Sequence, residues 1–286
     1  MEFVAVENVK LVGGVAVITG AASGIGAAMA RYAVQELGMK VVLADISRAA
    51  LDRASAELAA LGGDVLSVAT DVSKPEALDA LADRAYGQYG QVNLLVNNAG
   101  IELLGFSWEL PASQWEQLLG VNIHGVVHGV RAFLPRMIAS AEPAIVANLS
   151  SIAGISIAPL QASYVMSKHA VLAFSECLQL ELAMKQASIQ VSAVLPGPVK
   201  TKIFAALDEA TDPAVAEHHR QMVELLDRNG MGPEEAAETI FHQLQDGQFW
   251  VSTHPELTRA MAQQRGHSLS CLATPQLDAN SAFNLE

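Results

Sequence analysis

The chain is poor in cysteine, in long apolar runs and in metal-ligand clusters, and each shortage excludes a class of protein. Only Cys177 and Cys271 are present among 286 residues, so we expect no disulfide framework and a reducing, cytoplasmic setting. No His/Cys cluster has ligand spacing, which argues against a metal site. No run of about 18 apolar residues occurs, so no membrane-spanning helix is expected. The first residues also lack the basic and apolar segments of a secretory signal.

Basic side chains are also scarce. The sequence has 17 Lys and Arg against 30 Asp and Glu, for a formal net charge of −13. This balance argues against a nucleic-acid partner, which requires a basic face. Hydrophobic residues make up 51% of the chain, enough for a large core, and we interpret the excess as subunit interface, which favours a homodimer or a homotetramer.

Short apolar runs alternate with helical patterns along most of the chain. The runs predict strands, and the stretches between them predict helices, one of which has Ser47 as its N-cap and two of which open on capping boxes at Ser73 and Ser113. Alternation of this kind predicts an α/β fold, a Rossmann-like doubly wound parallel sheet of about seven strands with helices on both faces. The predicted strands are 15–19, 40–45, 65–69, 92–97, 144–148, 189–195 and 249–252, and the predicted helices are 24–37, 47–61, 73–89, 113–138, 162–185 and 233–245.

No internal boundary or repeat interrupts this pattern, so residues 1–286 are predicted to form a single domain with a core of about 10–255. The segment 198–231 departs from the alternation with charged residues and short helical pieces, which indicates a lid after the sixth strand. From about residue 253 the chain leaves the pattern altogether. There we expect a short helix over 255–265 and then a tail, which we hypothesise packs over a neighbouring subunit's cleft.

A glycine-rich turn, Thr19–Gly26, joins the first predicted strand to the first helix. In that context Gly20 allows the tight turn, Gly24 lets the backbone approach a pyrophosphate, and Gly26 permits close packing of helix on strand. Ser23 and Ile25 lie at the helix amino terminus, whose free N–H groups and positive dipole end suit phosphates. The alternative is an ordinary strand-to-helix turn.

Asp45 ends the second predicted strand, 19 residues after Gly26. A carboxylate there can accept both adenosine ribose hydroxyls and repels a 2′-phosphate, which favours NAD over NADP. Arg48 is the nearest cation that could offset this effect, and Asp45 could instead only cap the next helix. Asp71 and Val72 follow the third strand, where an adenine edge could be read, although Asp71 could equally be a turn residue.

Together these residues resemble the short-chain dehydrogenase/reductase family over about residues 10–255. The match also includes the segments Asn97–Gly100, Tyr164–Lys168 and Pro196–Thr201, with Asn122 and Ser151 between them, all in the family's order. The resemblance implies NAD as cofactor and a catalytic group of Asn122, Ser151, Tyr164 and Lys168. It also implies that further cofactor contacts come from Asn98, Ala99, Gly100, Tyr164, Lys168, Pro196, Gly197, Val199 and Thr201.

Tyr164 and Lys168 are four residues apart on a predicted helix and so share one face. A nearby positive charge favours the phenolate, so Lys168 and the nicotinamide ring of NAD⁺ are together expected to lower the pKa of Tyr164. Ser151 follows the fifth strand, where its hydroxyl would hold the substrate oxygen, and Ser150 is the neighbour that could be mistaken for it. The resemblance implies that Lys168 bonds the nicotinamide ribose and that Asn122 bends its helix and holds a proton-relaying water.

Most candidate pocket residues are apolar, which suggests a hydrophobic or aromatic secondary alcohol or ketone as the substrate. We therefore expect an NAD-dependent short-chain alcohol dehydrogenase in which Tyr164 is the general acid/base. Two alternatives stay open: an NADPH-dependent carbonyl reductase, and a non-catalytic, dinucleotide-sensing protein on the same fold. The candidate substrate contacts, of which Gln161 is a polar one, are Ile101, Leu103, Ala153, Ile155, Gln161, Pro198 and Ile203.

Overall fold

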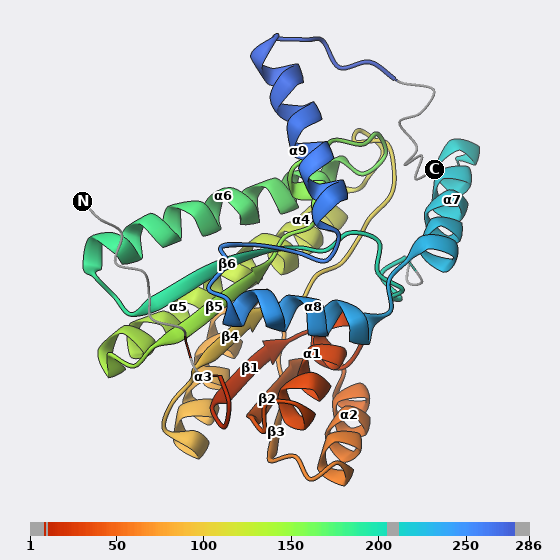
Figure 1. The fold of residues 1–286 in the computed structure, drawn as a ribbon. Helices are drawn as coiled ribbons and strands as arrows, with labels where there is room; N and C mark the ends of the chain where they lie inside the picture. Colours follow the sequence, from red (N-terminus) through yellow and green to blue (C-terminus); the bar gives the residue numbers. More distant parts are fainter. Residues whose placement is uncertain (1–8, 10, 205–211, 278–286) are drawn as a thin grey trace.

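A single parallel sheet of seven strands forms the centre of the molecule (Figure 1). The computed structural model describes residues 9, 11–204 and 212–277; positions 205–211 of the expected lid and 278–286 of the expected tail lie outside them. The strand order is β3-β2-β1-β4-β5-β6-β7, which confirms the predicted fold class. The strands are β1 Val15–Thr19, β2 Lys40–Asp45, β3 Val65–Ala69, β4 Leu94–Asn97, β5 Ala144–Leu149, β6 Ile189–Leu195 and β7 Trp250–Ser252.

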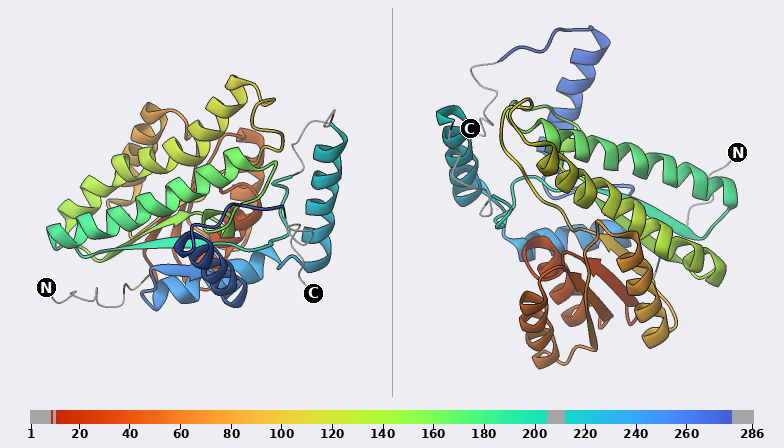
Figure 2. Two further views of the ribbon diagram at one scale, coloured as in Figure 1. Left: turned by 90° about the horizontal axis from the view of Figure 1, so that it is seen from above. Right: turned by 180° about the vertical axis from the view of Figure 1, so that it is seen from behind.

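Helices cover both faces of this sheet (Figure 2). Side chains alternate along a strand, so Ala16 and Ile18 of β1 enter the core beneath α1, α2 and α8, while Val15 and Val17 enter the core beneath α3, α5 and α6. Two buried cores result, one on each face. The helices are α1 Gly24–Gln35, α2 Arg48–Ala60, α3 Pro75–Tyr89, α4 Ala112–Leu119, α5 Gly125–Ser140, α6 Ala162–Lys185, α7 Pro213–Asn229, α8 Pro233–Gln245 and α9 Pro255–Ser270.

The helix starts agree with the sequence at one cap and disagree at two. The Ser47 hydroxyl caps α2 by accepting the Ala50 N–H, as predicted. The capping box at Ser73 is wrong, because α3 begins at Pro75, whose fixed φ and missing N–H suit a first helical position. The second box is also wrong, because α4 starts ahead of Ser113 with Pro111 at its cap position.

The helix expected over 113–138 is divided in three. A π-helical turn, Gly120–His124, separates α4 from α5. Within this turn the buried Asn122 amide donates to the Ile101 carbonyl and accepts from the Ile101 N–H, both at 2.9 Å. The extra residue of the turn thus coincides with a side chain that ties the helix to the loop after β4.

Strand order reverses between β1 and β4, so the crossovers after these strands run to opposite sides of the sheet. In doubly wound sheets a ligand binds at the carboxyl ends beside such a reversal. Buried side chains stabilise this part of the sheet: the Asn97 amide donates to Asn148 at 2.8 Å, and Asn148 donates to Ser175 of α6 at 3.0 Å. The fold therefore provides a rigid edge at which β1, β4 and β5 end together.

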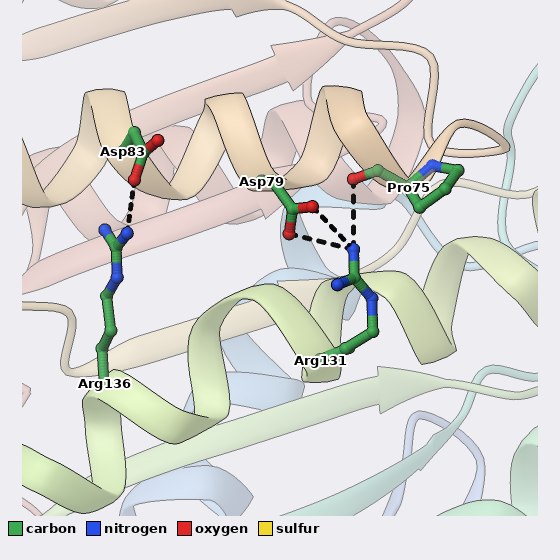
Figure 3. A network of polar contacts seen from close by, with 5 residues as sticks. All are labelled: Pro75, Asp79, Asp83, Arg131 and Arg136. Atoms are coloured by element: carbon green, nitrogen blue, oxygen red, sulfur yellow. Dashed lines mark hydrogen bonds and ion pairs between the residues drawn. The ribbon is translucent and has the colours of Figure 1, made fainter.

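Exposed ion pairs join α3 to α5 on one face (Figure 3). Arg131 donates to both oxygens of Asp79 at 2.9 Å and to the Pro75 carbonyl at 3.4 Å. One helical turn further on, Arg136 pairs with Asp83. These side chains are about half exposed, so the pairs add to the apolar packing between the helices without replacing it.

The segment after β6 contains one long helix where short helical pieces were expected. α7 has 17 residues and is capped by Asp212, whose carboxylate accepts the Ala214 and Val215 N–H groups. A parallel bridge between Val199 and Met231 closes the base of the segment.

The last helix, α9, extends to Ser270, beyond the expected end at residue 265. It has no buried residue, and it projects from the body of the molecule (Figure 1). Within the described ranges, 9, 11–204 and 212–277, no helix is both long and apolar enough to span a membrane.

Candidate active site

A cavity of about 510 Å³ lies at the carboxyl ends of the strands. Its volume is within the range of small-molecule sites. The glycine turn after β1 lines one end, and the residues after β4, β5 and β6 line the rest. Every predicted cofactor residue except Gly26 lines it: Gly20, Ser23, Gly24, Ile25, Asp45, Asp71, Val72, Asn98, Ala99, Gly100, Tyr164, Lys168, Pro196, Gly197, Val199 and Thr201.

Close backbone packing explains the glycine turn. Gly20 has φ +63°, and a Cβ on Gly26 would lie 2.3 Å from the Gly20 carbonyl oxygen, so the third glycine packs helix on strand without facing the cavity. The Asn98 amide donates to the Thr19 and Gly20 carbonyls at 2.8 and 3.1 Å, which ties the turn to the residues after β4.

The amino terminus of α1 offers a place for phosphates. The Ser23 side chain makes no capping hydrogen bond, so it leaves the N–H groups of the first turn uncapped. Ser23, Gly24 and Ile25 of this turn line the cavity. Free N–H groups at a positive dipole end bind anions. This turn therefore fits the pyrophosphate of a dinucleotide.

Asp45, at the end of β2, lies on the same side of the cavity. One carboxylate oxygen accepts the Ala22 N–H at 3.2 Å and the other accepts the Ser47 N–H at 3.0 Å. Arg48, the nearest cation by sequence, instead pairs with Asp52 at 2.9 Å on the surface of α2. The carboxylate is thus fixed by backbone groups on both sides.

Tyr164 and Lys168 lie side by side on α6 at the other end of the cavity. The Lys168 Nζ is 5.3 Å from the centre of the Tyr164 ring and donates to the Leu149 carbonyl at 2.9 Å. Both side chains are buried, and Lys168 is only 5% exposed. The carbonyl at the end of β5 thereby holds the ammonium beneath the phenol.

The protein groups around Tyr164 raise its pKa, whereas the expected lowering also requires the positive ring of NAD⁺. Burial raises the pKa of Tyr164, the Glu102 carboxylate raises it further, and hydrogen bonding with Ser151 opposes the increase. Burial also lowers the pKa of Lys168 to about 8, against an opposite effect of Glu102. In this dry site, desolvation is the largest effect on both groups and disfavours the charged form of each.

The two serines after β5 have different roles. The Ser150 hydroxyl is buried and donates to the Lys168 carbonyl at 2.8 Å, so it holds the backbone of α6. The Ser151 hydroxyl accepts the Ala153 N–H at 3.1 Å and also interacts with the Tyr164 side chain. Of the two hydroxyls, only that of Ser151 is beside the phenol.

Asn122 is buried behind the site and does not line the cavity. Besides its two bonds to Ile101, its amide donates to the Ser167 hydroxyl at 3.0 Å. A Cβ on Gly100 would lie 3.5 Å from both the Asn122 Oδ1 and the Lys168 Nζ. Asn122 thus links the loop after β4 to the lysine region of α6.

Sequence reasoning missed Glu102, which lines the cavity and is only 4% exposed. Burial raises its pKa well above the ordinary value, while Lys168 and hydrogen bonding from Gln161 act in the opposite direction. The signal was an acidic residue two positions after Gly100, in an otherwise apolar stretch at the carboxyl edge of the sheet.

Five of the seven expected substrate contacts line the cavity: Ile101, Ala153, Gln161, Pro198 and Ile203. Leu103 and Ile155 do not. Phe204, next to Ile203 in the expected lid, also lines the cavity. The structure adds an apolar wall from α7, Met222, Leu225 and Leu226, which the expectation of short helical pieces over 198–231 did not indicate.

A phosphate-binding turn and a buried Tyr–Lys pair at the same edge of a doubly wound sheet are typical of a dinucleotide-dependent oxidoreductase. Comparison with known proteins agrees. A family model described as short chain dehydrogenase matches residues 14–212. The chain belongs to the short-chain dehydrogenase/reductase family, whose members bind a nicotinamide dinucleotide.

Individual relatives are moderately similar. A CLA biosynthesis dehydrogenase/reductase of Lactiplantibacillus plantarum is 33% identical over 250 residues, covering 84% of this chain and 87% of that protein. The 1-deoxy-11-beta-hydroxypentalenate dehydrogenase of Streptomyces avermitilis is 32% identical over 256 residues, 87% of each. The probable oxidoreductase EphD of Mycobacterium tuberculosis is longer: a match at 36% identity over 229 residues covers 78% of this chain and 38% of that protein.

Among solved structures, a short-chain dehydrogenase/reductase from Burkholderia phymatum in complex with NAD is 36% identical. It superimposes with a TM-score of 0.89 over 94% of this chain and 98% of that one.

Proposed function

We propose that this enzyme is an NAD-dependent dehydrogenase that transfers a hydride between a secondary alcohol or ketone and NAD(H). The observation that supports this most is the convergence of Ser151, Tyr164 and Lys168 at one end of the cavity whose other end has the glycine turn and Asp45. Asn122 completes the proposed catalytic group from behind.

NAD is the proposed cofactor because of the acidic end of β2. The Asp45 carboxylate is fixed by two backbone N–H groups and would repel a 2′-phosphate, and Arg48 is engaged by Asp52. The Burkholderia phymatum relative was solved with NAD, which supports the same choice. Asp71 and Val72 line the cavity beside Asp45 and would contact the adenine.

In the proposed mechanism, Tyr164 removes the hydroxyl proton of the alcohol while Ser151 donates a hydrogen bond to the same oxygen. When bound, the dinucleotide would supply the hydride acceptor for the carbinol carbon, and its positive ring would favour the phenolate of Tyr164. Lys168, held by the Leu149 carbonyl, stabilises the phenolate and is placed to bond the nicotinamide ribose. In ketone reduction Tyr164 returns its proton to the oxygen.

A hydrophobic or aromatic substrate is proposed from the cavity wall. Ile101, Ile203, Phe204 and the side chains of α7 leave a largely apolar volume next to Tyr164. The dehydrogenase of a hydroxylated pentalenate from Streptomyces avermitilis supports an alcohol as the reacting group. A homodimer or homotetramer remains a prediction from composition.

The test is an absorbance assay at the nicotinamide band with a panel of secondary alcohols, run with NAD and with NADP. We expect turnover with NAD and a clear preference for it. Asp45→Ser should reduce the NAD/NADP ratio by about 10- to 100-fold, because a like-charge contact worth a few kcal/mol is removed. Glu36→Ser, an exposed acid at the end of α1, is the matched control and should leave the ratio unchanged.

The two alternatives give different results in the same assay. A preference for NADP, unaffected by Asp45→Ser, would favour an NADPH-dependent carbonyl reductase. Absence of turnover on alcohols and ketones, with NAD bound, would instead indicate a non-catalytic dinucleotide-sensing protein.

A further inference from the structure

The buried carboxyl group of Glu102 has one side-chain partner, Gln161, and one oxygen left over. This oxygen, Oε1, has no hydrogen-bond partner among the described residues, and the Lys168 ammonium donates to the Leu149 carbonyl. A buried polar atom without a partner costs about 1–3 kcal/mol. An unpartnered polar atom in a residue that lines a cavity is available to bond a molecule bound there.

Two loops that are bonded to each other fix the position of Glu102. Asn122 holds the preceding residue, Ile101, by both of its backbone groups. Three residues after Glu102, the Gly105 N–H donates to the Leu160 carbonyl at 2.9 Å. Leu160 precedes Gln161, the residue at the start of α6. Glu102 and Gln161 are therefore brought together by backbone contacts and do not depend on each other's side chains.

The Glu102–Gln161 pair is the buried polar feature of an apolar substrate region. Gln161 is 6% exposed and lines the same cavity. Gln117 and Lys202 also line it, but both are exposed and keep their hydration. Apart from Ser151 and Tyr164, which act at the reacting oxygen, the remaining nearby wall is apolar: Ile101, Ile203, Phe204, Met222, Leu225 and Leu226.

We propose that the Glu102–Gln161 pair recognises a second, uncharged oxygen on the substrate, so that the preferred substrate is a secondary alcohol or ketone bearing another hydroxyl or carbonyl group. This inference rests on the proposed dehydrogenase function and narrows its substrate class. The carboxyl group, in its protonated form, can donate to that oxygen and accept from it, and the Gln161 amide offers a second donor. An apolar substrate of the same size would leave the second oxygen of Glu102 without a partner.

The surroundings of Glu102 favour an uncharged carboxyl group and therefore an uncharged substrate oxygen. Burial favours the uncharged carboxyl and raises its pKa, and Lys168 only partly offsets this effect. The ionisable groups that face it are Lys168 and Tyr164, both on α6 and both buried. A cationic amino alcohol would require the ionised form and is therefore disfavoured.

The experiment compares 1-phenylethanol with three diols: 1-phenylethane-1,2-diol, 1-phenylpropane-1,3-diol and 1-phenylbutane-1,4-diol. Turnover is measured with NAD, and dissociation constants are measured by calorimetry on the NAD-loaded protein, so that selectivity can be read without chemistry. We expect the best diol to exceed the mono-alcohol by about 10- to 100-fold, because a site built to bond a hydroxyl rejects the analogue that lacks it.

Three variants test whether Glu102 is the source of the diol preference. Glu102→Leu should reduce the diol/mono-alcohol ratio to about 1 in both measurements. Glu102→Gln keeps an uncharged donor and acceptor and should retain most of it. Glu109→Leu is the same type of change at an exposed position of the same loop, outside the cavity, and should leave the ratio as in the wild type.

Failures of the two proposals are distinguishable. No turnover of any compound contradicts the dehydrogenase function, whereas the binding ratio still tests the Glu102–Gln161 pair. Equal binding of diols and mono-alcohol by the wild type overturns the inference. A ratio that survives Glu102→Leu also overturns it, as does stronger binding of 2-amino-1-phenylethanol than of the diols.

Discussion

In two regions of this molecule a basic side chain lies near an acidic one, at the surface in one region and in the interior in the other. Between α3 and α5, Arg131 and Asp79 meet at 2.9 Å while both remain about half exposed (Figure 3). At the carboxyl edge of the sheet, Lys168 and Glu102 are almost fully buried and do not form a direct pair. Hydration means that the exposed ion pair costs little to form and contributes little to stability. Burial, in contrast, disfavours the charged forms of both Lys168 and Glu102. The two groups whose charged forms are disfavoured thus lie at the proposed site of the reaction.

The largest expected effect is on turnover at the buried edge. Tyr164→Phe removes the group proposed to transfer the substrate proton, so kcat should fall by about 10²- to 10⁴-fold. Stability should change by less than about 1 kcal/mol, because only the hydroxyl is deleted. Steady-state kinetics and thermal unfolding measure the two effects, and NAD binding should be retained. Turnover close to the wild-type value would remove Tyr164 from the mechanism.

Lys168→Met tests the buried region of this comparison by its effect on the free energy of unfolding. The folded protein lowers the pKa of Lys168 from 10.5 to about 8, so holding the charged lysine costs the folded state on the order of 3 kcal/mol at neutral pH. The variant should therefore be more stable, by about 2 kcal/mol after the lost bond to Leu149 is counted, while it loses most of its activity.

The stability gained by Lys168→Met should decrease as pH rises. Below pH 8 the lysine is protonated in both folded and unfolded chains, so the advantage of Lys168→Met is complete. As pH rises from about 8 to about 10.5 the folded wild type holds fewer protons than the unfolded chain, and its stability approaches that of the variant. Denaturant unfolding at pH 7 and pH 10 measures the difference, and a constant difference would contradict the assignment.

The smallest effect is expected at the exposed pairs. Arg131→Ala should reduce the free energy of unfolding by less than about 1 kcal/mol, and the loss should shrink in high salt. Denaturant unfolding at low and high ionic strength measures it, and Arg53→Ala, a change at an exposed arginine of α2, is the control. A loss comparable to the Lys168 effect would break the contrast between the two regions.

Features set by short spacings were predictable from the sequence. The strand alternation, the glycine turn and the Tyr164–Lys168 face depend on residues only a few positions apart, so local patterns reveal them. The Ser73 capping box failed because Pro75 competes locally for the helix start. The burial of Glu102 depends on Asn122 and on the Gly105–Leu160 bond. These contacts join segments far apart in the chain, and no pattern within one segment encodes them.

The direction of the Tyr164 pKa shift within the protein could not be predicted from the sequence for another reason. Spacing predicted that the two side chains are neighbours, and they are. The sign of the Tyr164 pKa shift depends on how dry the site is, which the packing of several loops decides. The apolar contribution of Met222 also depends on how α7 lies against the cavity.

The π-helical turn Gly120–His124 accommodates one extra residue between α4 and α5. A π-helical turn holds one residue more than an α-helical turn, and one residue corresponds to about 100° of rotation. Deleting a single residue there would let α4 and α5 merge into a regular helix. Because the wider turn absorbs the extra residue, the helices on either side would keep their phase, but the Asn122 amide would move away from Ile101. The loop that presents Glu102 would then lose one of its two anchors without any change to the loop itself.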